Sequence, residues 1–178
     1  MEGRKLPENA LSACMGAAFA QLPDVIRRAH QGRIRLSGTA EVTRGRGIAG
    51  WLAGFMNMPE SHPAYPMEVD GDHQADAMHW SRSFNGRRMV SMFRRDGGHL
   101  VENMGPIKLR LRPVAEAGRL VYRLEGAKLG PLPLPGLLMP RLVAWEGERD
   151  GFYDFEVDVG LPLIGRLIRY RGKLRLSA

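Results

Sequence analysis

The chain has 178 residues, of which 44% are hydrophobic and 25% are charged, and its formal net charge is +7. This length suits one domain with a substantial core, so we expect a single domain over residues 1–178. Only four of the 26 basic residues are lysine, and this bias follows either from genomic base composition or from recognition of phosphate and carboxylate groups. Cys14 is the only cysteine, which excludes an intrachain disulfide and a structural zinc site built on cysteines.

Helices are predicted at the amino-terminal end and at one later place. Residues 8–30 carry apolar side chains at helical spacing, and Pro23 divides them into a first helix and a short second one. A further helix is predicted at 47–56, where an uncharged segment aligns one apolar stripe, made of Ile48, Trp51, Leu52 and Phe55. Such a helix is either buried or lies against a lipid or a partner, and we expect burial because core helices are the commoner case.

Residues 33–178 are predicted to form an antiparallel sheet into which the helix at 47–56 is inserted. After Met67 the apolar residues recur with a period of two, and glycine-bearing turns come about every ten residues. Asn85-Gly86 is the clearest turn, because this dipeptide supplies the positive φ angles that a two-residue hairpin requires. The prolines of 130–140 cannot join a central ladder, so this segment is predicted to be a crossover loop or a short helix.

The last two strands form the clearest predicted hairpin. The first alternates apolar residues with Asp154, Glu156 and Asp158, and the second alternates them with basic residues between 169 and 175. We therefore expect the acidic row beside the basic row on the outer face, where much of the basic charge finds an internal partner. For this reason we expect only weak, salt-sensitive contact with nucleic acid and no specific binding of it.

Together these patterns predict a mainly β fold of the α+β type. About nine antiparallel strands form a meander that curves into a barrel or half-barrel. The amino-terminal helices and the helix at 47–56 are expected to cover the open side of this sheet. A sheet curved in this way can enclose one small ligand.

The sequence also bears on the location of the protein. No apolar segment reaches the roughly 18 residues needed to span a bilayer, so we expect no transmembrane segment. Residues 11–14 read like the lipid-attachment end of a bacterial lipoprotein signal, but Pro7, Glu8 and Asn9 interrupt the apolar run that such a signal needs. Because a single cysteine also suits a reducing compartment, we expect a cytoplasmic protein.

An arginine and a glutamate occupy positions where the strand pattern calls for apolar side chains. Arg82 belongs to the alternating run at 78–84, so its guanidinium points toward the apolar face. Glu102 takes the same place in the alternating run at 100–104. One face of the sheet therefore holds opposite charges, either as an internal polar staple or as part of a ligand site. The hairpin turn places the small Ser91 opposite Trp80, which leaves room for the two charges to approach each other.

Other chemistry is not indicated by the sequence. The histidines lack the spacing of metal ligands, so we expect no metal site; they are His30, His62, His73, His79 and His99. Neither Ser81 nor Ser91 lies in a nucleophile elbow, and Gly45-x-Gly47 is not followed by the lysine of a phosphate-binding loop. We therefore expect no cofactor and assign no catalytic residue.

Several spaced motifs in the chain form a joint pattern. They are Leu22-Pro23 with His30, Gly38-x-Ala-x-Val-x-x-Gly45, Trp80-x-Arg82-x-Phe84, Glu102-x-x-Gly105, the Pro/Leu run at 130–135, Asp150-Gly151, and Leu161-Pro-Leu-x-Gly165 followed by Tyr170-x-Gly172. Together they cover about residues 22–176 and resemble the bacterial family filed as domain of unknown function 4166 (DUF4166). The resemblance implies a free-standing cytoplasmic protein or a carboxy-terminal partner of dehydrogenase-like domains, and it assigns no catalytic residue.

The leading hypothesis is non-enzymatic binding of an apolar or amphipathic molecule, such as a carboxylate-bearing lipid, on the concave face of the sheet. Arg82 would meet the head group, Ser91 and Glu102 would lie beside it, and Trp80, Phe93 and Met104 would line the tail. One alternative is an isomerase or cyclase that acts on such a molecule, with Arg82 in the site and Glu102 as acid or base. The other is an interaction domain that serves a dehydrogenase-like partner.

Overall fold

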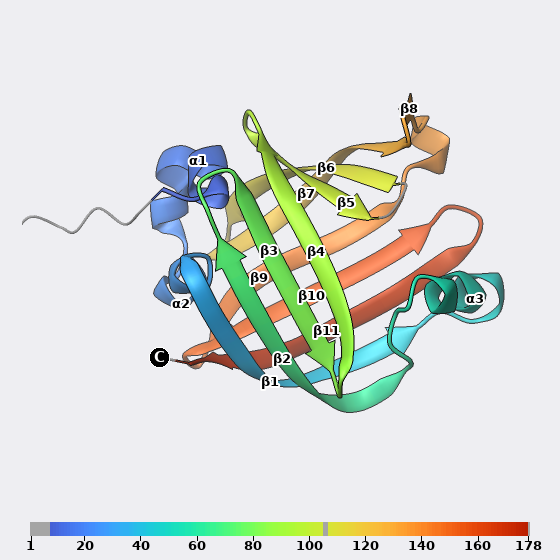
Figure 1. Ribbon diagram of the computed structural model, residues 1–178, viewed down its shortest axis with the longest axis horizontal. Coiled ribbons are helices and arrows are strands. Elements are labelled where there is room, and N and C mark those ends of the chain that lie inside the picture. Colours follow the sequence, from blue (N-terminus) through green and yellow to red (C-terminus); the bar gives the residue numbers. More distant parts are fainter. Residues whose placement is uncertain (1–7, 105–106, 178) are drawn as a thin grey trace, which may run out of the picture.

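The computed structural model describes residues 8–104 and 107–177, which form one antiparallel sheet with a few short helices (Figure 1). The strand order is β6-β5-β4-β3-β2-β1-β11-β10-β9-β7-β8, and an additional pairing of β6 with β7 joins the two sides of the meander. The mainly β antiparallel fold is therefore confirmed. It is a closed barrel of ten strands with one short extra strand, β8.

The helices are short and the strands are long. The helices are α1 (Ala10–Met15), the 3-10 helix η1 (Gly16–Gln21), α2 (Asp24–Ala29), α3 (Gly47–Phe55) and the 3-10 helix η2 (Gly136–Leu138). The strands are β1 (Gly32–Arg44), β2 (His62–His73), β3 (Ala77–Phe84), β4 (Arg87–Asp96), β5 (His99–Met104), β6 (Ile107–Glu116), β7 (Arg119–Leu129), β8 (Leu132–Pro133), β9 (Arg141–Arg149), β10 (Phe152–Leu161) and β11 (Gly165–Leu176). None of the described helices is long and apolar enough to cross a bilayer.

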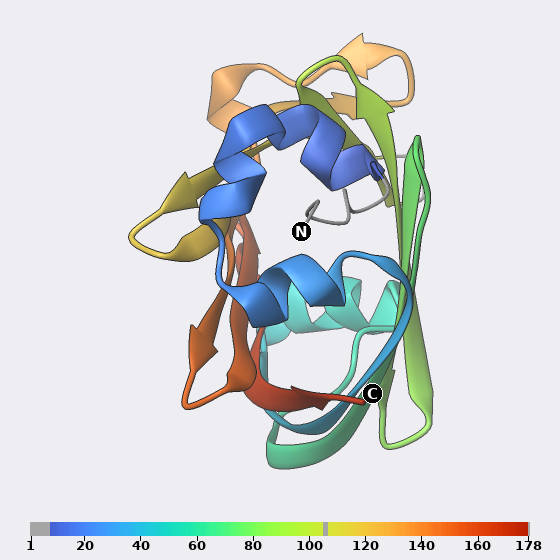
Figure 2. The same ribbon diagram turned by 90° about the vertical axis from the view of Figure 1, so that its left-hand side faces the viewer.

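The up-and-down order of the strands gives the barrel two unlike ends. We call the end that carries α1, η1 and α2 the helical end, and Figure 2 looks toward it. The turns β2–β3, β4–β5, β6–β7 and β9–β10 lie at the same end, because antiparallel strands reverse direction at each turn. We call the opposite end the far end; it carries α3, the β3–β4 and β10–β11 turns and the segment 130–140.

The amino-terminal helices close the helical end. An Asn9–Ser12 capping box starts α1, and the Asn9 side-chain amide donates a hydrogen bond to the carbonyl of His30 (2.7 Å). This bond ties the start of α1 to the end of α2, which were both predicted within residues 8–30. Their apolar side chains enter the barrel core, where Leu11 and Ile26 are fully buried.

The terminal hairpin pairs as its sequence pattern predicts. In the register of β10 with β11, Asp154, Glu156 and Asp158 lie opposite Lys173, Arg171 and Arg169. The acidic residues reach basic neighbours on the outer face, as in the contact between Arg169 Nε and Glu156 Oε1 (2.8 Å). Phe155 and Tyr170 are buried on the other face, so the alternation sets which side of the hairpin builds the core.

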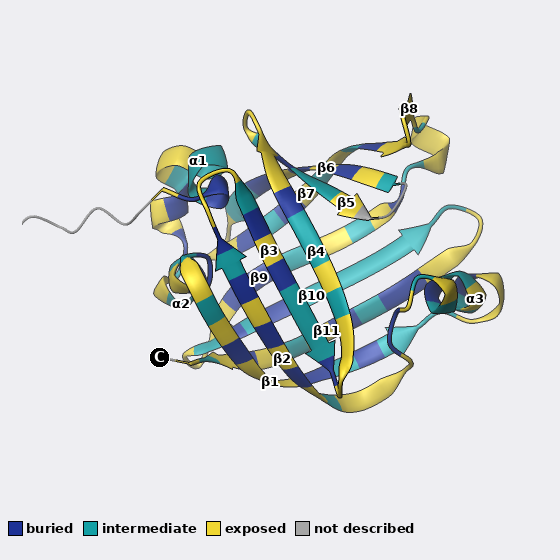
Figure 3. Cartoon of the chain, in the orientation of Figure 1, coloured by how far each residue is buried: buried dark blue, intermediate teal, exposed yellow. Residues whose placement is uncertain are grey.

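Helix α3 occupies the predicted place, but the expected burial of its apolar stripe is wrong for three of the four residues, and Leu52 alone packs partly against the core. Ile48, Trp51 and Phe55 are 71%, 70% and 81% exposed, whereas Ala49 and Ala53 are buried (Figure 3). The segment just before the helix lies close to β11, because a Cβ atom at Gly45 would lie 1.9 Å from the carbonyl oxygen of Arg166. The helix buries its small residues Ala49 and Ala53, and its largest side chains face outward.

The barrel also has no open side for α3 to cover, since the ten strands close on themselves. The looser place is the seam between β7 and β9, where two residue pairs join the strands, Leu120 with Glu146 and Val121 with Trp145. Beyond these pairs the two strands separate toward the far end, and the segment 130–140 with β8 and η2 connects them. The segment predicted as a crossover loop or short helix therefore bridges the seam.

A glycine on the inner face of β11 allows the close approach of β1. A Cβ atom at Gly172 would lie 2.2 Å from the carbonyl oxygen of Thr39, which is backbone and cannot rotate away. We therefore expect Gly172→Ala to lower the free energy of unfolding by about 1–3 kcal/mol, measured by urea denaturation. Gly126→Ala is the matched control, since its Cβ would lie 3.8 Å from the nearest atom and leave the sheet unstrained. Equal losses in the two variants would contradict this account.

Candidate functional site

The barrel encloses a cavity with a volume of about 100 Å³. Five of the six residues predicted for the ligand site line it, namely Arg82, Glu102, Trp80, Ser91 and Phe93. The sixth, Met104, is the last residue of β5, and its side chain lies outside the described residues. Most of the remaining lining is apolar, with contributions from Met58, Met67, Met89, Leu142, Val157 and Val159. The predicted site residues of β3, β4 and β5 therefore face the same interior space.

Arg82 presents its guanidinium to this cavity. The β3–β4 register places Arg82 opposite Met89 and Trp80 opposite Ser91, as the Asn85-Gly86 turn predicts. Nη1 of Arg82 donates a hydrogen bond to Oγ of Ser91 (3.0 Å), and the guanidinium carbon lies 5.8 Å from the Trp80 ring centroid. Within the described residues Ser91 is its only hydrogen-bond acceptor. A guanidinium has five N–H donors, so most of those on Arg82 remain available to a molecule in the cavity.

Glu102 lies across Ser91 from Arg82. Its strand pairs with β4 so that Glu102 is opposite Phe93, which brings the carboxyl group onto the inner face. Burial raises the pKa of Glu102, while a hydrogen bond with Ser91 and the charge of Arg82 act in the opposite direction. Among the described residues the two charged groups form no ion pair within 4 Å, and Ser91 mediates between them. The expectation that both face the interior is confirmed, and their link is indirect.

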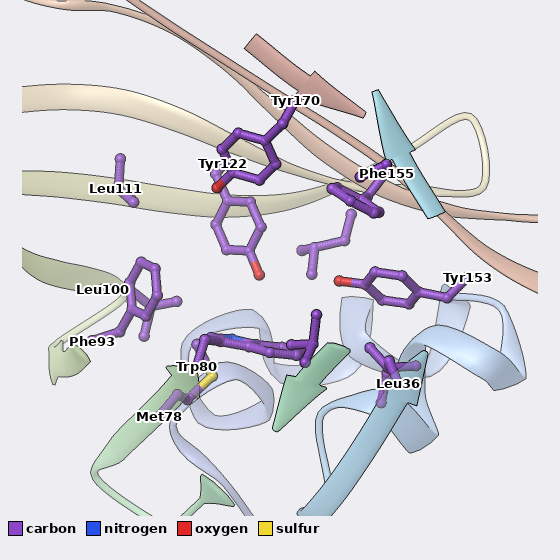
Figure 4. Packing of buried hydrophobic residues seen from close by; sticks show 14 of the residues in the cluster. Leu36, Met78, Trp80, Phe93, Leu100, Leu111, Tyr122, Tyr153, Phe155 and Tyr170 are labelled. Atoms are coloured by element: carbon purple, nitrogen blue, oxygen red, sulfur yellow. The ribbon is translucent and has the colours of Figure 1, made fainter. Parts of the chain in front are cut away.

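A second buried polar cluster, which the sequence reasoning missed, lies beside the cavity. It consists of His30 from the end of α2, Glu146 of β9, Tyr122 of β7 and Tyr153 of β10. Nε2 of His30 lies 3.1 Å from Oε2 of Glu146, and the Tyr122 hydroxyl donates a hydrogen bond to Oε1 of Glu146 (3.1 Å). In Figure 4 the hydroxyl groups of Tyr122 and Tyr153 point toward one another over the ring of Trp80.

The charges of this cluster compensate each other. Burial opposes charge on His30, but the carboxylate of Glu146 outweighs it and raises the pKa of His30. Burial also acts on Glu146, where His30 and the two tyrosines outweigh it and lower the pKa. Nδ1 of His30 is a donor, because its partner at 2.9 Å is the carbonyl oxygen of Ile26. Both ring nitrogens of His30 therefore face acceptors, and this geometry together with the two pKa directions favours a buried imidazolium–carboxylate pair.

One part of this cluster could have been found in the sequence. Leu142, Ala144 and Glu146 alternate on β9, so the rule that placed Arg82 also places Glu146 on the inner face. The position of His30 carried no such signal, because its partner comes from a distant strand.

His73 lies next to the cluster, and its pKa is shifted in the opposite direction from that of His30. Its ring is buried 5.4 Å from the ring of His30 and 4.7 Å from that of Trp80, and neither nitrogen has a hydrogen-bond partner among the described residues. Burial, and then the charge of His30, lower the pKa of His73 to about 3. His73 is therefore a neutral ring packed against a charged one.

Within residues 8–104 and 107–177, no cluster of three acidic, histidine or cysteine side chains is placed to hold a metal ion.

The cavity opens toward the far end of the barrel. On the inner face of β10, Tyr153 and Phe155 near the helical end are buried, whereas Val157 and Val159 are half-buried (Figure 3). The inner residues of β9 change in the same direction. A surface groove over the β7–β9 seam shares Tyr122, Leu142, Ala144 and Trp145 with the cavity, so the two spaces meet along this seam. The polar groups thus lie toward the closed end, and the apolar walls lead toward the opening.

The coupling between Arg82 and Glu102 can be measured. Removal of either charge leaves the other buried beside Ser91, so we expect Arg82→Ala and Glu102→Ala each to cost about 1–3 kcal/mol of unfolding free energy. The double variant should cost less than the sum by about 1 kcal/mol, measured by urea denaturation. The exposed outer pair Arg35–Asp70 (2.8 Å) serves as a control whose coupling stays well below about 1 kcal/mol. Strict additivity at Arg82 and Glu102 would show that the two groups do not interact.

His73 should make the protein sensitive to acid. The unfolded chain protonates this residue below about pH 6.5, whereas the folded protein resists protonation down to about pH 3. The stability that comes from neutral His73 is fully present above pH 6.5 and is lost as the pH falls toward 3. At pH 5 the loss in the free energy of unfolding is about 2 kcal/mol. His73→Leu should remove this share of the loss between pH 7.5 and pH 5 in urea denaturation. His79→Leu, an exposed change on β3, is the control, and identical pH profiles for His73→Leu and the unchanged chain would refute the assignment.

The chain matches a protein family but no individual curated protein or solved structure. A protein-family model described as "Domain of unknown function (DUF4166)" matches residues 22–174. The matched range covers most of the barrel together with α2 and His30, and it confirms the resemblance seen in the spaced motifs. The chain belongs to the DUF4166 family, whose function is unknown.

Proposed function

We propose that this protein binds, without chemical change, an amphipathic carboxylate-bearing molecule of lipid type inside the barrel, with Arg82 as the partner of the carboxylate. The observation that carries the proposal is a guanidinium that faces a largely apolar cavity and has one hydrogen-bond acceptor, Ser91, among the described residues. A carboxylate can accept two parallel hydrogen bonds from an arginine. Such charge-assisted bonds are stronger than hydrogen bonds between neutral groups.

The charge balance of the interior supports an anionic ligand. Glu146 is already compensated by His30, whereas Arg82 and Glu102 form no ion pair among the described residues and meet only through Ser91. An incoming carboxylate could therefore pair directly with the Arg82 guanidinium, since a buried cation is stabilised by a hydrogen-bonded anionic partner.

The size of the cavity bears on how such a molecule would lie. A volume of about 100 Å³ is too small for a long acyl chain, since an engineered cavity of about 150 Å³ takes up only a ring the size of benzene. The tail would have to extend along Met89, Val157 and Val159 toward the far end. Methionine side chains adapt to ligands of different shape, and Met58, Met67 and Met89 all line the cavity. The ligand class is thus an anionic head group with a flexible apolar tail.

One observation favours the enzymatic alternative, an isomerase or cyclase. Burial raises the pKa of Glu102, and a carboxyl group of raised pKa beside an arginine can act as an acid or base on a bound carboxylate. In that case the molecule recovered from the protein would differ from the one supplied, and Glu102→Gln would stop the change. Recovery of the supplied molecule unaltered supports binding alone.

The proposal includes a cytoplasmic location, because a chain with a single cysteine suits a reducing compartment.

Binding should depend on the arginine and on the carboxylate together. We expect Arg82→Gln to weaken binding of a fluorescent long-chain fatty acid about tenfold or more, because it removes a charge-assisted pair. The corresponding fatty alcohol should bind both proteins alike. A fluorescence titration measures both affinities.

Arg94→Gln is the control, since Arg94 is exposed on the outer face of β4. Circular dichroism and a denaturation midpoint establish that Arg82→Gln remains folded. Failure of the unchanged protein to bind the fatty acid, or an equal loss for the acid and the alcohol, would refute the role of Arg82.

A further inference from the structure

Exposed apolar side chains are gathered on one half of this barrel. The large hydrophobic residues that stand exposed among the described residues are Ile48, Trp51, Phe55, Val90, Leu129, Leu132, Leu137, Leu138, Val143, Leu163 and Ile164. All of them belong to α3, the segment 130–140, the β10–β11 turn, or the parts of β4, β7 and β9 nearest the far end. None lies at the helical end in the part of the chain that the structure describes.

Three projecting segments carry most of this apolar surface. Helix α3 exposes Ile48, Trp51 and Phe55, and the last two stack with ring centroids 6.0 Å apart. The β10–β11 turn exposes Leu163 almost completely, at 95%, and Gly45 ahead of α3 is hydrogen-bonded to Leu167 of β11 (2.9 Å). Figure 1 shows α3, this turn and the η2 segment at the same end of the barrel.

The charges at the far end are predominantly basic. Basic residues there that form no ion pair within the described residues are Arg44, Arg46, Arg87, Arg88, Lys108, Lys128 and Arg141. The acidic residues of the same half are Glu60, in the connection after α3, and Glu68, which lies in one cross-strand row with Ser83 and Arg88. Two more are already paired, Glu41 with Arg171 (2.8 Å) and Asp158 with Arg166 (2.8 Å). The helical end differs, because acids and bases alternate there in pairs such as Arg33–Asp72 and Arg149–Asp154. The excess positive charge therefore surrounds the exposed apolar groups.

We infer that the far end of the barrel docks on the surface of an anionic lipid bilayer. Exposed tryptophan, phenylalanine and leucine side chains insert at the boundary between head groups and acyl chains, and arginine and lysine around them bind anionic head groups. Trp51, Phe55 and Leu163 are the groups that enter this boundary. The inference concerns a surface outside the cavity and stands whether or not the cavity holds a ligand.

The geometry favours a bilayer over a protein partner. Most of the apolar groups stand on three separate projections. A folded partner would have to match all three at once, whereas a lipid boundary receives each one independently. Standard protein interfaces also pair charges of both signs across a polar rim, while this rim carries an excess of one sign. The opening of the cavity lies at the same end, so docking would bring it against the lipid.

Co-sedimentation with vesicles tests the inference. We expect the full chain to bind vesicles of phosphatidylcholine with phosphatidylserine, and to bind vesicles of phosphatidylcholine alone at least about tenfold more weakly. Trp51→Ser combined with Phe55→Ser should reduce binding to the anionic vesicles by about tenfold or more. Arg46→Gln combined with Arg141→Gln should reduce it by a similar factor, and added salt should do the same.

The matched control is Arg94→Gln combined with Arg95→Gln, which removes two exposed charges near the helical end of β4 and should leave vesicle binding unchanged. A site-specific readout comes from brominated lipids, which quench a tryptophan in the acyl region. Quenching should be lost in Trp51→Phe although this variant still binds, because Trp80 is buried and Trp145 is stacked by Arg119 on the barrel wall.

Several outcomes would overturn the inference. They are equal binding to the two kinds of vesicle, quenching that persists in Trp51→Phe, and self-association through α3 in place of vesicle binding. Arg82→Gln should keep vesicle binding, so a failure of ligand binding and a failure of docking are told apart.

Discussion

Closure of the barrel is the constraint on which the rest of this structure depends. Because β6 pairs with β7, every second side chain on ten strands points into one enclosed space. An ionisable group at such a position must be paired or face a cavity, since desolvation disfavours its charged form. The interior satisfies this rule in two ways. His30 compensates Glu146, and Arg82 faces the cavity with Ser91 between it and Glu102.

The helices make the two ends of the barrel chemically different. Helix α2 carries His30 into the helical end, where Ile26 and Leu11 complete the core and exclude water from the charged pair. Helix α3 stays outside the core at the far end, where it buries Ala49 and Ala53 and exposes its largest apolar side chains. One end is therefore closed by helices over a buried charged pair, and the other carries the exposed apolar side chains.

The candidate site could be predicted in part, because the alternation of side chains along each strand shows which residues face inward. Arg82, Glu102 and Ser91 were placed together because side chains alternate across a strand and because Asn85-Gly86 sets the register of one hairpin. Glu146 followed the same rule and could have been found. His30 could not, since it meets Glu146 only through the packing of α2 against β9 and β10. The stripe on α3 was identified correctly, but its direction was wrong, because Ala49 and Ala53 form the buried face of this helix.

The sequence by itself determined the local features of this protein: the strand phase, the turns, the facing rows of charge on the terminal hairpin and the inward direction of Arg82. These depend on backbone geometry over a few residues, which the amino-acid pattern reflects directly. The tertiary structure alone decided that the sheet closes, that β7 and β9 separate near the far end, and that the contact between the two charges runs through hydrogen bonds to Ser91. It also decided the pKa directions of His30, His73 and Glu102, because desolvation depends on residues far apart in the chain.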